Sequence, residues 1–126
     1  MPRVRSGARL RIVLAECGWT WLPPLLWRLD KEWKGLQREI PWVTRPPSAT
    51  LREHVRATVQ PLDAPPEPQR LVEVIEQLGS DAFLLHASDF PHPHAATLEA
   101  TLGGLAPSGL LARVREENPR SVYRLP

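Results

Sequence analysis

The chain has 126 residues, of which 42% are hydrophobic and 24% are charged, and its formal net charge is +2. This length fits one domain or less, the hydrophobic content excludes a wholly disordered chain, and so slight a basic excess without a recognition motif predicts no nucleic-acid partner. Fifteen prolines exclude a simple helical bundle, and a single cysteine excludes both an internal disulfide and a cysteine-rich zinc site.

Residues 1–8 have no hydrophobic periodicity and are predicted to form a loose N-terminal segment, whereas residues 9–126 need no internal domain boundary. Arginines near the N-terminus precede an apolar run at 12–15, which stops at Glu16. This run is too short for a secretory signal, and no stretch is apolar enough to cross a bilayer. We therefore expect a cytoplasmic protein without a membrane partner.

Short apolar runs alternate with amphipathic segments along the chain. Four consecutive apolar residues within the first run predict a strand that is buried on both faces. Apolar residues spaced three and four apart predict the long helix that follows, which tolerates two prolines in its first turn. The predicted elements are strands at 9–17, 55–59 and 82–86, helices at 21–38, 48–54, 67–78, 95–102 and 108–117, and a last short turn at 118–125.

The order β-α-α-β-α-β-α-α predicts an α/β fold with a parallel sheet and right-handed crossovers. In such folds the functional residues lie at the carboxyl ends of the strands. Asp89 follows the third predicted strand and is the strongest candidate, either as a metal ligand or as a base that takes a proton from a metal-bound water. The alternative is that Asp89 caps the turn before Pro91.

Other polar residues lie near the predicted strand ends. Glu16 ends the first strand, and because buried glutamates are uncommon, it is expected to be functional or paired with an arginine. His92 lies three residues after Asp89 and is expected to contact a substrate or ligand. His94, the second histidine of the His-Pro-His sequence, is the weaker candidate, and His86 is expected to be a hydrogen-bonded core residue.

Five tryptophans lie between positions 19 and 42. Trp19 and Trp21 follow the end of the first predicted strand, so they are candidates to line a substrate mouth or a subunit contact. Trp27 and Trp33 lie within the long predicted helix, where packing is the expected role because each aromatic side chain buries a large apolar area.

Six segments of the chain form a pattern when they are taken in order. They are 10–23, 25–31, 45–48, 60–61, 88–92 and 117–125. Together they resemble bacterial amidohydrolase-related proteins, the group similar to aminocarboxymuconate-semialdehyde decarboxylase.

This resemblance implies a metal-dependent (β/α)8 TIM barrel, of which the chain would be the C-terminal part with about the last three parallel strands and their helices. It implies a divalent metal ion, expected to be zinc, and a small-molecule substrate. The family's metal-site aspartate after the final strand is matched by Asp89, and the strand-six histidine of the decarboxylase is matched by Glu16. The family's His-x-His after the first strand and its mid-barrel histidine have no match, so we expect an incomplete site.

Two classes of function follow. In the first, the chain is a truncated or split piece of a hydrolase or decarboxylase barrel that supplies Asp89, with Glu16 and His92 near the substrate, and it needs a complementing N-terminal barrel fragment. In the second, the chain is a non-catalytic module that self-associates or binds another barrel piece, because three barrel strands leave open edges. A third possibility is a gene remnant without function.

Overall fold

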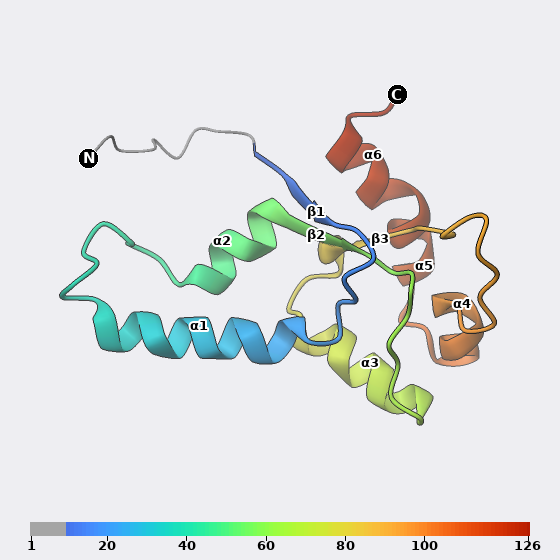
Figure 1. Ribbon diagram of the computed structural model, residues 1–126, viewed down its shortest axis with the longest axis horizontal. Helices are drawn as coiled ribbons and strands as arrows, with labels where there is room; N and C mark the ends of the chain where they lie inside the picture. Colours follow the sequence, from blue (N-terminus) through green and yellow to red (C-terminus); the bar gives the residue numbers. More distant parts are fainter. Residues whose placement is uncertain (1–9) are drawn as a thin grey trace.

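The fold is built on a small parallel sheet, seen in the computed structural model of Figure 1, which describes residues 10–126. The predicted loose segment 1–8 lies outside the described residues. The strands are β1 (Ile12–Leu14), β2 (Val55–Thr58) and β3 (Leu84–Leu85), and they lie in the order β1-β2-β3. In the register of the sheet, Ile12 lies beside Val55 and Thr58 beside Leu85.

Helices connect and cover the strands, and their order confirms the predicted α/β pattern of a partial barrel. In Figure 1, α1 and α2 lie on one side of the molecule and α4, α5 and α6 on the other. The helices are α1 (Leu22–Leu36), α2 (Pro47–His54), α3 (Pro68–Gln77), α4 (Leu98–Leu102), α5 (Leu110–Ala112) and α6 (Asn118–Tyr123), with short turns η1 (Asp81–Phe83), η2 (Gly103–Leu105) and the π-helical η3 (Arg113–Glu117).

The core lies where β2 faces the helices. Val55, Ala57 and Val59, which alternate along this strand and its extension, belong to the apolar core, and Arg56 and Gln60 on the other face are also buried. Leu22 and Leu26 of α1 join the same cluster, one helical turn apart. The core therefore ties the central strand to the first helix.

The first strand differs from its prediction. The side chain of Ile12 is 45% exposed, and Val13 and Leu14 are only partly buried. The expectation that this strand is buried on both faces is wrong, because β1 lies at the edge of the sheet with β2 as its one neighbour among the described strands.

The C-terminal segment also differs from its prediction. The expected short turn after residue 117 is wrong, since α6 continues the helix to Tyr123, and Pro119 is accommodated in the first turn of α6. This helical segment covers the outer edge of β3. The side chain of Asn118 donates to the carbonyl of Leu84 at 2.9 Å, and the amide of His86 donates to the carbonyl of Val114 at 3.0 Å.

No helix within residues 10–126 is long and apolar enough to span a membrane. The cytoplasmic location stays a prediction.

Candidate functional site

The candidate site is the edge of the sheet where the three parallel strands end. Glu16 follows β1, Gln60 follows β2, and Asp89 follows β3. One side chain links two of these ends, because the Thr58 hydroxyl accepts a hydrogen bond from the Glu16 amide at 3.3 Å and donates to the Gln60 carbonyl at 3.1 Å. The parallel topology thus brings the ends of three separate chain segments to one edge.

Asp89 has a left-handed backbone conformation, and its carboxylate lies close to an imidazole. Its φ of 57° lies in the left-handed region, which aspartate enters more readily than most residues. Its side chain is 14% exposed, and its Oδ2 lies 2.6 Å from Nε2 of His94. Its Oδ1 lies 3.6 Å from Nδ1 of His92. Both carboxylate oxygens therefore face imidazoles from the loop that follows the strand.

The contact with His94 lowers the pKa of Asp89. The hydrogen bond from His94 is the largest cause of a lowered pKa of the Asp89 carboxyl, against an opposing effect of desolvation. An ionised carboxylate can only accept hydrogen bonds, so the hydrogen between the two groups is on Nε2 of His94. Asp89 is consequently suited to accept a hydrogen bond from a bound molecule and is a poor proton donor.

The two histidines of the His-Pro-His sequence have unequal positions. His92, expected to contact a substrate, has a side chain that is 73% exposed, whereas that of His94 is 26% exposed. The amide of His92 donates to the carbonyl of Asp89 at 2.8 Å, which closes a turn. This turn returns the chain so that His94, five residues on, reaches the carboxylate. The sequence favoured His92 because His92 is closer to Asp89 along the chain. Sequence spacing alone does not reveal the turn that brings His94 to the carboxylate.

Glu16 is not the buried residue that the sequence suggested. It is exposed and has a φ of 58°, and no ion pair within residues 10–126 involves it. The expectation of burial is wrong because Glu16 lies beyond the end of an edge strand. β2 separates its strand from that of Asp89. A catalytic role for Glu16 stays a prediction.

The tryptophans also differ from their expected positions. Trp19 is fully buried in the core, so it does not line an open mouth, and its indole Nε1 has no hydrogen-bond partner. Trp21 is 42% exposed, and its Nε1 donates to the carbonyl of Cys17 at 2.9 Å. Trp27, expected to pack, is 54% exposed, whereas Trp33 is partly buried and donates to the carbonyl of Val43. Trp21 remains the one candidate of the predicted pair for substrate contact.

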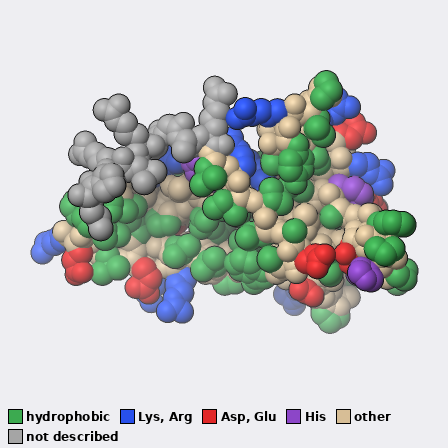
Figure 2. Space-filling view, turned by 45° about the horizontal axis from the view of Figure 1, so that its top comes forward, with side chains coloured by type: hydrophobic (Ala, Val, Ile, Leu, Met, Phe, Trp, Pro, Cys, Tyr) green, Lys and Arg blue, Asp and Glu red, His purple; other side chains and the backbone are tan. Residues whose placement is uncertain are grey.

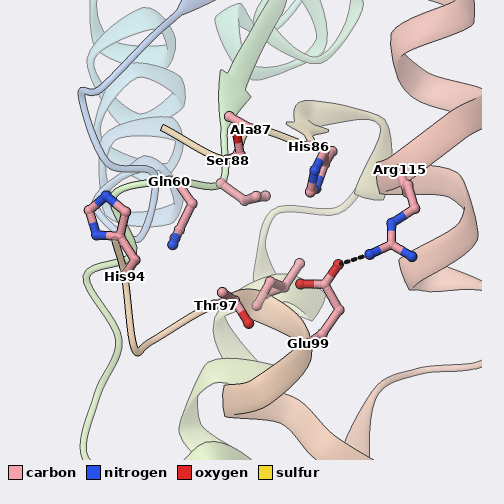
Figure 3. A pocket seen from close by; sticks show the side chains of 10 residues that line it. Gln60, His86, Ala87, Ser88, His94, Thr97, Glu99 and Arg115 are labelled. Carbon is pink, nitrogen blue, oxygen red and sulfur yellow. Dashed lines mark hydrogen bonds and ion pairs between the residues drawn. The ribbon is translucent and has the colours of Figure 1, made fainter. Parts of the chain in front are cut away.

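A hollow of about 300 Å³ lies beside the ends of β2 and β3. Figure 3 shows Gln60 and His94 on one side of it and His86 with Arg115 on the other, with Thr97 and Glu99 below. His86 is exposed in this hollow, so the expected core role is wrong. Arg115 and Glu99 form an ion pair at 3.4 Å.

Gln60 is a residue that the sequence did not single out. It is 3% exposed, and its side-chain nitrogen donates to the carbonyl of Ala96 at 3.0 Å. Its Oε1 is buried without a partner. Buried polar atoms are nearly always paired, so an unpaired acceptor beside a hollow marks a place where a bound water or ligand could donate.

The described residues do not form a metal centre. No group of three or more His, Cys, Asp or Glu side chains within residues 10–126 is arranged to hold an ion. Catalytic zinc sites use about three protein ligands. Asp89 is the candidate ligand that the family resemblance provides, and both of its oxygens face histidines. The donor set in this part of the chain therefore does not fit a divalent metal site.

Comparisons with known proteins identify the family. The amidohydrolase family model matches residues 3–125, so the chain belongs to the amidohydrolase family. The fold is similar to 5-carboxyvanillate decarboxylase LigW from Sphingomonas paucimobilis, with a TM-score of 0.61 and 23% identity, over 93% of this chain and 34% of that one.

It is also similar to 2,6-dihydroxybenzoate decarboxylase in complex with 2,6-dihydroxybenzoate, with a TM-score of 0.53 and 19% identity, over 92% of this chain and 35% of that one. No curated protein matches the chain. The chain thus has the fold of part of a barrel and spans about a third of the length of these two structures.

Proposed function

We propose that the chain is the Asp89-bearing part of an amidohydrolase-family decarboxylase, with a site that residues outside 10–126 complete. The observation that carries this proposal is the position of Asp89, ionised and partly buried, at the carboxyl end of the last strand of a partial barrel. Support also comes from the two similar structures, both of which are decarboxylases. As in their names, the substrate class is a hydroxylated or alkoxylated aryl carboxylate.

Decarboxylation of such a substrate breaks the bond between the ring carbon and the carboxylate, releases CO2 and places a proton on that carbon. A carboxyl whose pKa is lowered is a poor donor of this proton, so the proton comes from solvent or from a residue outside 10–126. We assign Asp89 the role of orienting a substrate hydroxyl, whose hydrogen bond it accepts as a carboxylate. Glu16, His92 and Trp21 are the remaining candidates for substrate contact.

A chimera tests this function. The chain replaces the segment of 5-carboxyvanillate decarboxylase that it matches, and CO2 release from 5-carboxyvanillate and from 2,6-dihydroxybenzoate is measured. We expect turnover that Asp89→Asn removes and that Glu32→Gln, the same loss of charge at an exposed position of α1, leaves intact. A folded chimera without turnover, or turnover that survives Asp89→Asn, would contradict the proposal.

The non-catalytic alternative has one specific observation in its favour. The outer edge of β1 lacks a partner strand among residues 10–126, and Leu10 and Ile12 are 59% and 45% exposed there. Hydrophobic side chains also reach the surface elsewhere on the face seen in Figure 2. An open apolar edge strand promotes pairing between chains.

Sedimentation velocity over a range of protein concentrations tests self-association. If the β1 edge mediates it, wild type forms dimers or larger species and Ile12→Lys is a monomer. A wild-type chain that stays monomeric at all concentrations would exclude this alternative.

A further inference from the structure

We propose that His94 and a divalent metal ion compete for the carboxylate of Asp89, so that a metal reaches this aspartate only by displacing the imidazole. The family resemblance implies a metal at this position, whereas the described residues present a carboxylate that already has a partner. This competition concerns Asp89 and its loop in the isolated chain, in which residues outside 10–126 supply no further ligands.

The side chains of His94 and Asp89 are in direct contact. Nε2 of His94 lies 2.6 Å from Oδ2 of Asp89, at the short end of charge-assisted hydrogen bonds. The two side chains are 26% and 14% exposed, so water competes weakly for the pair. A metal ion on Oδ2 would need the space and the lone pair that this N–H group uses.

The loop after β3 holds the side chains of Asp89 and His94 together. The left-handed backbone of Asp89 and the hydrogen bond from the His92 amide to its carbonyl fix a turn. Pro91 and Pro93 restrict φ at alternate positions of the same segment. The imidazole of His94 is thus delivered by a loop with few alternative conformations, and little ordering entropy is lost when it binds the carboxylate.

A metal ion at Asp89 would find too few other ligands in the described part of the chain to offset the loss of the hydrogen bond from His94. No group of three metal-binding side chains occurs in the described part of the chain. An ion that displaces His94 would gain Asp89 alone, whereas stable sites gain several ligands together. Because the ion would gain so few ligands, the hydrogen bond from His94 is favoured over a metal ion at this carboxylate.

The opposite possibility is that His94 is itself a ligand. Imidazole is the commonest metal ligand among side chains, and rotation of the ring could present a nitrogen to an ion that Asp89 also holds. The two possibilities predict opposite effects of removing the imidazole. Loss of a competitor strengthens metal binding, and loss of a ligand weakens it.

The experiment uses the full 126-residue chain at a fixed neutral pH. Mn²⁺ is titrated into wild type and His94→Ala, and paramagnetic broadening of the Asp89 backbone amide resonance gives the apparent Kd. We expect His94→Ala to lower this Kd by about tenfold, because a hydrogen bond to a charged group no longer has to be broken. His92→Ala, which removes the exposed neighbouring imidazole, is the matched control and should change the Kd by much less.

The gain must depend on the carboxylate. Asp89→Asn combined with His94→Ala should therefore lose the broadening that His94→Ala gains. A Kd that rises or does not change in His94→Ala would overturn the proposal, and so would a His94→Ala protein whose Asp89 amide shows no effect of Mn²⁺.

A second measurement needs no variant, in case His94→Ala does not fold. The ring ¹⁵N resonances of His94 in wild type are followed while Zn²⁺, which is diamagnetic, is added. Competition predicts that Nε2 stays protonated as its hydrogen bond is lost. A shift of either ring nitrogen to a metal-bound value would show that His94 is a ligand and would refute competition.

Discussion

The carboxylate of Asp30 in α1 accepts two hydrogen bonds from Ser48 in α2, one from the backbone amide at 2.9 Å and one from the hydroxyl at 2.7 Å. α2 begins after Pro46, which has no side chain that could cap the helix. Asp30 therefore caps the second helix from the first and aligns the pair that lies side by side in Figure 1.

Removing this cap should destabilise the fold. We expect Asp30→Ala to lower the free energy of unfolding by about 1–2 kcal/mol, because an amide of the first helical turn loses its acceptor. Urea denaturation measures the change, and Glu32→Ala, at an exposed position of the same helix, should have little effect. Equal effects of the two substitutions would show that the cap contributes nothing.

Gly79 ends α3 with a φ of 70°, and a Cβ atom there would lie 2.9 Å from Nε of Arg52. That guanidinium donates to the carbonyl of Leu78 at 2.9 Å, so it has little freedom to move. Gly79→Ala should therefore cost about 1–2 kcal/mol from the left-handed backbone, with a further cost from displacing Arg52.

Gly35 provides the matched control for this substitution. It lies in α1, and a Cβ atom added there would meet no neighbouring side chain within 4 Å. Gly35→Ala should stabilise the chain by about 0.5–1 kcal/mol, because alanine loses less backbone entropy in a helix. Thermal unfolding followed by circular dichroism should thus give shifts of opposite sign, and shifts of the same sign would contradict the geometry.

Asn118 joins the C-terminal helical segment to β3. Its buried side-chain amide donates to the carbonyls of Asp81 at 2.8 Å and Leu84 at 2.9 Å. Asn118→Ala leaves two carbonyls without this donor and should lower the free energy of unfolding by about 2 kcal/mol. Glu116→Ala, at an exposed position of the preceding turn, is the control, and hydrogen exchange at the His86 amide should increase only in the Asn118 variant.

The pKa of Asp89 should respond to His94. Because the hydrogen bond from His94 lowers the pKa of this carboxyl, the hydrogen-bonded Asp89 carboxylate stabilises the fold above the ordinary carboxyl pKa of about 4. The stabilisation is lost as the pH falls through the lowered value. A ¹³C titration of the Asp89 carboxyl should show a higher pKa in His94→Ala than in wild type. An unchanged pKa would mean that the hydrogen bond does not form in solution.

The element order and the location of the strand ends could be predicted from the sequence because both depend on local signals. Proline and glycine positions, apolar runs and helical spacing indicate where β1, α1 and α3 lie, and hence that Glu16 and Asp89 follow strands. The helix after residue 117 was missed because Asn118-Pro119 also starts turns. Pro119 is tolerated here in the first turn of a continuing helix.

Sequence patterns were sufficient for the α/β pattern, the amidohydrolase resemblance and the position of Asp89 after a strand. The folded structure was needed to show that Trp19 is buried while Trp21 is exposed, that Gln60 has an unpaired oxygen, and that His94 reaches Asp89. The physical reason is that periodicity reports which face of an element is apolar, whereas a side chain's partner depends on backbone turns and on segments distant in the chain. Five residues separate Asp89 from His94, and the turn between them brings the two side chains together.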